Sequence, residues 1–201
     1  MTPAVFLDRD GTVIQERGYL DRLELIELFP WSVEAIRLLK DAGYAVVIVT
    51  NQAGIARGYF DEAFVQAAHG HLDALLRESG AVVDGYYYCP HHPDGAVERY
   101  RLACDCRKPA PGLVRQAAAD LGLDVGRSFV VGDKWLDVGL AVNAGARGIL
   151  VRTGYGGHDL PAAPPPGHGC AATVDTLLDA ARWILAHATA AADAPARPRT
   201  G

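Results

Sequence analysis

The sequence has few cysteines, no large surplus of charge and no long apolar run. Its 201 residues include 4 cysteines, and the formal net charge is −5. Four cysteines are poor material for a disulfide scaffold, and a mildly acidic chain has no electrostatic attraction to nucleic acid or anionic lipid. An apolar run such as residues 45–49 is too short to cross a bilayer. We therefore expect a soluble, cytoplasmic protein that binds neither nucleic acid nor membrane.

The chain does have enough apolar residues for one core. Half of it is hydrophobic, and a chain of this length buries roughly 70% of its unfolded surface. We expect a single domain over residues 1–188 and a monomer. Residues 160–169 are proline-rich and read as an exposed connection, whereas 189–201 form an Ala/Pro/Arg tail that has little to bury and is expected to be disordered.

Short β-branched runs alternate with segments of helical periodicity along the chain. Strands are expected at 5–7, 45–50, 84–89, 128–132 and 148–152, and helices at 31–42, 61–79, 111–121, 136–144 and 174–188. This alternation predicts an α/β fold, a doubly wound and mainly parallel sheet of the Rossmann-like type. The segments that follow residues 10 and 50 are short, so we expect no large cap domain.

Polar residues follow the expected strands at the points where the strands end. Asp8, Asp10 and Asp133 are carboxylates in such positions, and Thr50 ends the second strand. In an open parallel sheet these carboxyl ends meet in one crevice. Three converging carboxylates repel one another unless a cation neutralises them, and hard oxygen ligands favour Mg²⁺.

The spacing of the first two carboxylates suits a two-step transfer of a phosphoryl group. Asp8 and Asp10 leave opposite faces of an extended segment unless the chain turns, and Gly11 permits that turn. One carboxylate can then attack phosphorus while the other protonates the leaving oxygen. Thr50 can donate a hydrogen bond to a phosphoryl oxygen, and Lys108 can neutralise the developing charge.

Four segments resemble, in order and in strand context, the four motifs of the haloacid-dehalogenase-like phosphatases. They are residues 6–12, 50–52, 108–109 and 132–134. The resemblance implies a HAD-type fold, with Asp8 as the nucleophile and Asp10 as general acid and base. It also implies Mg²⁺ held by Asp8, Asp133 and the Asp10 carbonyl, and it matches Asp137 to an outer acidic position.

A second group of residues has the ligand types of a zinc site. Cys89, Cys104 and Cys106, together with either His91 or His92, offer thiolate and imidazole ligands for tetrahedral Zn²⁺. Buried free thiols are the alternative. Four protein ligands leave no open position, so the zinc is expected to be structural and to stabilise a loop over residues 89–106.

The expected task of this zinc loop is to position cations. Residues 92–103 have little apolar periodicity, so we expect that burial alone does not order them. Arg107 and Lys108 follow directly. Loss of zinc is therefore expected to damage catalysis without removing any catalytic group.

Several residues can select the substrate. Arg57 and Arg107 can act as planar forks for a second phosphate, and Asn51 is a further candidate for substrate binding. Residues 54–58, together with the Cys/His loop, resemble the branch of the superfamily that removes one phosphate from a heptose bisphosphate, which favours a phosphorylated sugar as substrate and His91 as the zinc ligand. A histidinol-phosphate phosphatase and a non-catalytic zinc-stabilised interaction module are the alternatives.

Overall fold

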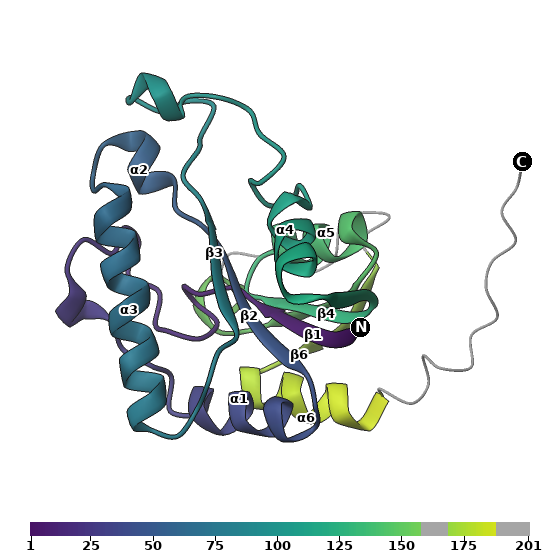
Figure 1. Ribbon diagram of the computed structural model, residues 1–201. Helices are drawn as coiled ribbons and strands as arrows, with labels where there is room; N and C mark the ends of the chain where they lie inside the picture. The colour runs from purple at the N-terminus through teal and green to yellow at the C-terminus, as the bar shows by residue number, and fades with distance from the viewer. Residues whose placement is uncertain (158–168, 188–201) are drawn as a thin grey trace, which may run out of the picture.

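The computed structural model describes residues 1–157 and 169–187. Six parallel strands form one sheet in the order β3-β2-β1-β4-β5-β6 (Figure 1). The strands are β1 (Thr2–Leu7), β2 (Ala45–Asn51), β3 (Gly85–Cys89), β4 (Leu123–Gly132), β5 (Arg147–Val151) and β6 (Cys170–Val174). The expected tail, and the expected connection apart from Gly169, lie outside the described residues.

Helices cover both faces of this sheet. They are α1 (Ser32–Asp41), α2 (Ala53–Arg57), α3 (Glu62–Glu78), α4 (Gly112–Leu121), α5 (Trp135–Ala144) and α6 (Leu177–His187). Short 3₁₀ turns are η1 (Leu23–Leu25), η2 (Glu98–Tyr100) and η3 (Gly154–Gly157). Side chains of α1, α3 and α6 pack in one core cluster and those of α4 and α5 in another.

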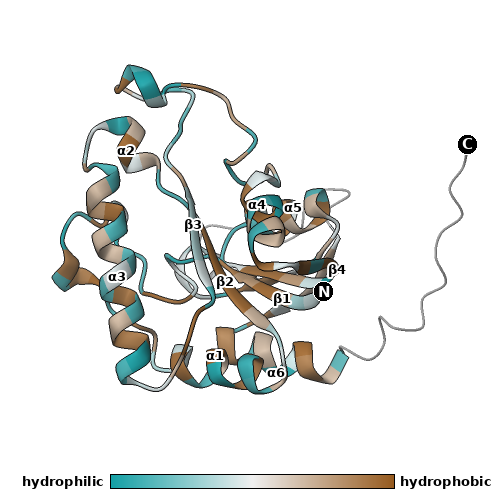
Figure 2. Cartoon of the chain, in the orientation of Figure 1, coloured by the Kyte–Doolittle hydropathy of each residue, from teal (hydrophilic) through white to brown (hydrophobic). Residues whose placement is uncertain are grey.

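The period of two along β1 divides its side chains between these clusters. Val5 and Leu7 pack with α1, α3 and α6, whereas Ala4 and Phe6 pack with α4 and α5. All four are fully buried, as expected for a parallel strand covered on both faces. Figure 2 shows the resulting band of apolar strands between helices whose outer faces are polar. The α/β class and the parallel sheet predicted above are confirmed.

One α-helix and one strand were not expected from the sequence, and two strands begin earlier than expected, β1 at Thr2 and β4 at Leu123. α2 has five residues, too few to show helical periodicity, and β6 follows the proline-rich segment. β4 begins at Leu123, five residues before the expected Ser128, because Leu123 pairs with Thr2 at the start of β1. A register shift between Pro3 and Val5 accommodates the additional residues.

Helix α3 begins at Glu62, directly after its N-cap residue Asp61. Asp61 is extended, and its carboxylate accepts a hydrogen bond of 2.8 Å from the backbone N–H of Phe64. This cap places the long helix beside β3, against the face that also holds α1 (Figure 1). Within residues 1–157 and 169–187, no helix is long and apolar enough to span a membrane.

Candidate active site

The carboxyl ends of β1 and β2 open into a cavity of about 330 Å³. Asp8, Asp10, Thr50 and Lys108 line the part of the cavity that we call its floor, and the rest of the lining comes from the end of β2 and the connections that follow β1 to β5. Such a crevice beyond the strand ends is where open α/β sheets bind ligands. The structure therefore brings the four expected catalytic side chains to one place.

Lys108 lies between two carboxylates rather than in solvent. Its Nζ is 2.8 Å from Asp8 Oδ1 and 2.6 Å from Asp137 Oδ1, and it donates a hydrogen bond to the Val49 carbonyl. Burial alone would lower the pKa of Lys108, but the two carboxylates outweigh burial and raise that pKa above its usual value. The amine is therefore a permanent cation that fixes the orientation of Asp8.

Asp133 is the carboxylate with unfilled hydrogen-bonding capacity. It is fully buried, and its Oδ2 accepts a hydrogen bond of 2.8 Å from the backbone N–H of Tyr155, whereas its Oδ1 is buried with no hydrogen-bond partner. Burial and the neighbouring Asp8 raise the pKa of Asp133 to about 7. A buried carboxylate oxygen of this kind is a ready ligand for a cation.

Two further carboxylates lie close to that of Asp133. Oxygens of Asp8, Asp133 and Asp137 all lie within 4.8 Å of one another. Lys108 offsets only part of this negative charge, and the Nζ of Lys134 lies farther away, 4.0 Å from Asp133 Oδ1, so the group still favours a bound cation. Both oxygens of Asp137 already accept donors, from Lys108 Nζ and the Lys134 backbone N–H, so Asp8 and Asp133 are the carboxylates open to a cation.

A salt bridge and an amide hold the side chain of Asp10. Arg9, only 3% exposed, donates from Nε and Nη2 to the two carboxylate oxygens at 3.1 Å each. Gln52 Nε2 donates to Asp10 Oδ2 at 3.1 Å and to Thr50 Oγ1 at 2.8 Å. This network connects the end of β1 to the end of β2 and orients the Asp10 carboxylate.

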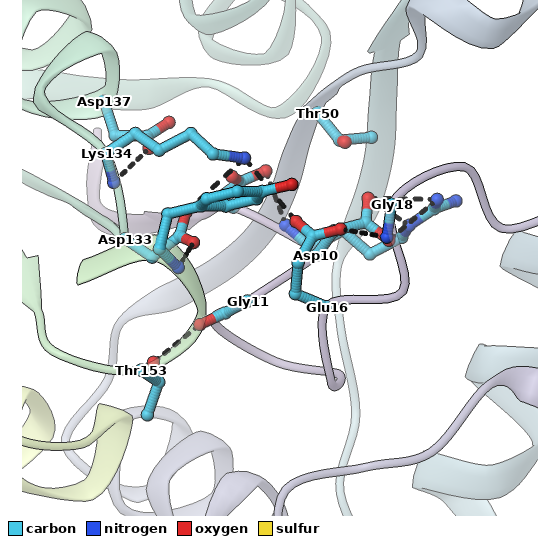
Figure 3. A network of polar contacts seen from close by, with 12 residues as sticks. Asp10, Gly11, Glu16, Gly18, Thr50, Asp133, Lys134, Asp137 and Thr153 are labelled. Atoms are coloured by element: carbon cyan, nitrogen blue, oxygen red, sulfur yellow. Dashed lines mark hydrogen bonds and ion pairs between the residues drawn. The ribbon is translucent and has the colours of Figure 1, made fainter. Parts of the chain in front are cut away.

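The turn directly after Asp10 requires a glycine. Gly11 has φ +81°, and a Cβ there would collide with Oδ2 of Asp133. Thr153 Oγ1 donates to the Gly11 carbonyl at 2.6 Å (Figure 3). The close approach allows the segment after β1 to contact the segment after β4.

Asn51 has a positioning contact that the sequence did not suggest. Its Oδ1 accepts from the backbone N–H of Lys108 at 3.0 Å, and its Nδ2 donates to the Lys108 carbonyl at 3.2 Å. The side-chain amide thus pairs with both backbone polar groups of one residue, as a neighbouring strand would. Asn51 lines the cavity as well, but its amide groups hold Lys108 in place.

The four expected thiol and imidazole ligands converge at the end of β3. Sγ of Cys106 lies 3.2 Å from Sγ of Cys89 and of Cys104, and 3.3 Å from Nδ1 of His91. All four ligand atoms lie within 4.8 Å of one another, an arrangement that can hold a metal ion. Nδ1 of His92 instead accepts from the Asp94 backbone, so the structure selects His91.

The expectation that burial does not order residues 92–103 is wrong in part. Tyr100 in η2 is only 8% exposed and packs with Ile55, Ala56 and Val65 of α2 and α3. Its hydroxyl donates to Glu62 Oε1 at 2.5 Å. A single aromatic residue in an irregular segment has no periodicity, and so its burial could not be predicted from the pattern.

The two arginines differ in their relation to the cavity. Arg107 lines it, and donates from Nη1 to the His91 carbonyl at 3.2 Å. Arg57 lies beside the cavity, with its guanidinium 5.9 Å from the centroid of the Tyr19 ring, which does line it. Both cations are therefore on the side of the site where the zinc loop lies.

Sequence reasoning overlooked some of the residues that complete the site. Arg9 and Gln52 are adjacent to expected catalytic residues, and Glu16 lies in the connection over residues 9–29 that could select the substrate, but the pattern gives none of the three a role of its own. For Arg9 a signal was available. This residue lies between two aspartates at the end of a buried strand, where a positive charge needs a partner. Nothing in the pattern marked Glu16, which follows an irregular segment.

This fold and this arrangement of carboxylates and lysine define a HAD-like hydrolase, and a family model described as HAD-hydrolase-like matches residues 105–180. The chain is 46% identical over 154 residues to the D-glycero-beta-D-manno-heptose-1,7-bisphosphate 7-phosphatase of Salmonella typhi, which covers 76% of this chain and 81% of the relative. The protein of that name in Escherichia coli K12 is 47% identical, with 76% and 80% covered. The chain belongs to this family of HAD-like phosphatases.

Solved structures support the same assignment. The D,D-heptose 1,7-bisphosphate phosphatase of B. bronchiseptica, complexed with magnesium and phosphate, has a TM-score of 0.79 and 34% identity, and covers 92% of this chain and 99% of its own. The enzyme of that name from Burkholderia Thailandensis has a TM-score of 0.66 and 30% identity, with 91% and 98% covered.

Proposed function

We propose that this protein is a magnesium-dependent phosphatase that removes the C7 phosphate of D-glycero-D-manno-heptose 1,7-bisphosphate through an aspartyl phosphate. The observation that carries the proposal is the contact of Asp8 with Lys108 beside the unfilled Oδ1 of Asp133. The names of the relatives supply the substrate. Neither histidinol phosphate nor a non-catalytic role has a comparable observation in its favour.

The residues at the floor fit a magnesium ion. Asp8 and Asp133, with the Asp10 carbonyl, would hold it, because carboxylate and carbonyl oxygens are the hard ligands that Mg²⁺ prefers. When bound, Mg²⁺ supplies Lewis-acid polarisation of the phosphoryl oxygens and shields the nucleophile from their charge.

The protein's own groups carry the reaction. Asp8 attacks phosphorus, the bond between phosphorus and the C7 oxygen breaks, and Asp10 gives its proton to that oxygen. A water molecule then attacks the aspartyl phosphate while Asp10 accepts its proton, which frees inorganic phosphate and restores Asp8. Thr50 donates to a phosphoryl oxygen, and Lys108 balances the charge that develops there.

The Cys₃His cluster fits a structural zinc ion. Cys89, His91, Cys104 and Cys106 would fill four positions and leave none for substrate. Arg107 follows the last of these ligands, and the zinc loop packs on α2, which carries Arg57. We propose that both arginines bind the second phosphate of the substrate, in the planar manner typical of guanidinium groups.

A comparison of initial rates tests the proposal. The protein is incubated with Mg²⁺ and, in parallel, with both anomers of heptose 1,7-bisphosphate, fructose 1,6-bisphosphate and histidinol phosphate. We expect the highest kcat/KM for the heptose bisphosphate, with the beta anomer preferred because the relatives' names specify it. A preference for histidinol phosphate would overturn the assignment of substrate, and absence of phosphate release from every ester would overturn the enzyme.

A further inference from the structure

Glu16 is a carboxylate in the cavity that the proposed reaction does not use. It lies in the connection between β1 and α1, and its side chain is 15% exposed and lines the cavity with Asp8 and Asp10. Its Oε1 accepts from the backbone N–H of Gly18 at 2.7 Å. The side chain is therefore held by its own loop, with its charge toward the space above the floor.

Lys134 approaches the other oxygen of Glu16 from the opposite side of the cavity. Its Nζ is 3.5 Å from Glu16 Oε2 and 4.2 Å from the centroid of the Tyr155 ring. Figure 3 shows the lysine extending toward Glu16 from the start of α5. At 3.5 Å the pair is longer than a good hydrogen bond, so both groups retain capacity for further partners.

The charge of Glu16 indicates which part of a substrate faces it. A carboxylate repels phosphate, so it would weaken binding if it faced either phosphate of a bisphosphate. The scissile phosphate belongs at Asp8 and Lys108, and the second phosphate beside Arg107. The neutral middle of the substrate is left for Glu16, and a carboxylate there is an acceptor for hydroxyl groups.

We infer that Glu16, oriented by Gly18 and Lys134, accepts hydrogen bonds from the hydroxyls of the leaving alcohol and makes the site specific for polyol phosphates. The inference rests on the proposed function. Burial raises the pKa of Glu16, and Lys134 opposes this effect, so the lysine helps to keep the acceptor ionised. A site built to bind hydroxyls discriminates strongly against an analogue that lacks them.

Two substrates with the same kind of ester separate hydroxyl recognition from catalysis. Heptane-1,7-diol bisphosphate has a primary phosphate ester and a second phosphate, as heptose 1,7-bisphosphate does, but no hydroxyl group. Glu16→Ala removes the acceptor, whereas Glu16→Gln keeps an oxygen for the Gly18 N–H and loses the charge. Glu27→Gln is the matched control, because Glu27 lies in the same connection, is 56% exposed and pairs with Arg17.

We expect Glu16→Ala to lower kcat/KM for the heptose bisphosphate by about 10- to 100-fold and Glu16→Gln by about 10-fold. For the diol bisphosphate, kcat/KM and its Ki as an inhibitor should change by less than about 3-fold. Equal losses on both substrates would overturn the inference, as would a wild-type enzyme that does not prefer the polyol. Absence of turnover on either ester by the wild type would instead overturn the proposed function, and this inference with it.

Discussion

The structure contains two clusters of ligating side chains, and different physical means hold them together. Asp8, Asp133 and Asp137 come from the ends of β1 and β4 and the first turn of α5, so the register of the sheet places them. In the thiol cluster, Cys89 ends β3, whereas Cys104 and Cys106 lie in an irregular segment.

Without metal, the two clusters also differ in the charge of their ligands. Lys108 offsets part of the charge of the carboxylates, and the remainder calls for a cation. Burial raises the pKa of the Cys89 thiol to about 11, so this thiol is neutral until a metal displaces its proton. This difference fits the two proposed roles, in which a metal at the first cluster takes part in the chemistry and a metal at the second holds a loop in position.

The largest expected effect comes from a substitution in the carboxylate cluster, where the proposed nucleophile lies. Asp8→Asn removes the nucleophile, because a neutral amide cannot attack phosphorus, and should lower kcat by at least about 1,000-fold. Phosphate release and a thermal melt monitored by circular dichroism measure activity and folding. Asp41→Asn, at the exposed end of α1, is the control. Near-normal turnover by the Asp8→Asn variant would overturn the role of Asp8.

A smaller loss is expected from the thiol cluster. Cys106→Ser should lower zinc content and reduce kcat/KM by about 10- to 100-fold without unfolding the sheet, because no catalytic group is removed. Metal analysis, initial rates and hydrogen exchange over residues 92–103 measure these effects. Cys170→Ser is the control, since Cys170 lies in β6, outside the cluster. Unchanged turnover in folded, zinc-free protein would refute the positioning role.

The cations that this loop positions should affect binding more than turnover. Arg107→Ala and Arg57→Ala should raise KM about 10-fold for the heptose bisphosphate and less than about 3-fold for a heptose 7-phosphate, because only the former has a second phosphate. Arg115→Ala, on the exposed side of α4, is the control. Equal changes for both substrates would exclude the two arginines from a second-phosphate site.

The smallest effect concerns the hydrogen bond from Tyr100 to Glu62, which ties the loop over residues 89–106 to α3. Hydrogen bonds from Tyr100 and Tyr88 lower the pKa of Glu62 below its usual 4.5. The corresponding stability is present above that usual value and is lost as the pH falls through the lower value of the folded protein. Glu62→Gln should therefore cost about 1 kcal/mol or less near pH 7 and flatten this acid dependence.

Urea unfolding from pH 3 to 7 measures this contribution. Glu78→Gln, at the exposed end of the same helix, is the matched control. An acid dependence that is the same in wild type and Glu62→Gln would show that the ionised Glu62 carboxylate does not stabilise the fold through Tyr100 and Tyr88.

Much of the fold could be predicted because its signals are local. A buried strand followed by a helix has a recognisable apolar pattern, and the carboxyl ends of parallel strands share one edge. Asp8, Asp10 and Asp133 could thus be expected together from their positions alone. β6 and α2 could not, because the pattern of a short, small-residue strand or a five-residue helix is too weak.

The partners within the site were beyond such reasoning. Nothing in the pattern shows that Lys108 is buried between two aspartates, or that Asn51 contacts it across 57 positions of the chain. Tyr100 similarly donates to Glu62, 38 positions away, which no spacing rule connects to it.

The linear chain alone set most of the alternating strands and helices, the acidic residues that follow the strands and the chemical types of the candidate metal ligands, because each depends on neighbours a few residues away. Folding settled which cation meets which carboxylate, that His91 rather than His92 joins the thiols, and that Glu16 faces the cavity. Those outcomes depend on how distant segments pack, and packing is a property of the whole sheet and its helices.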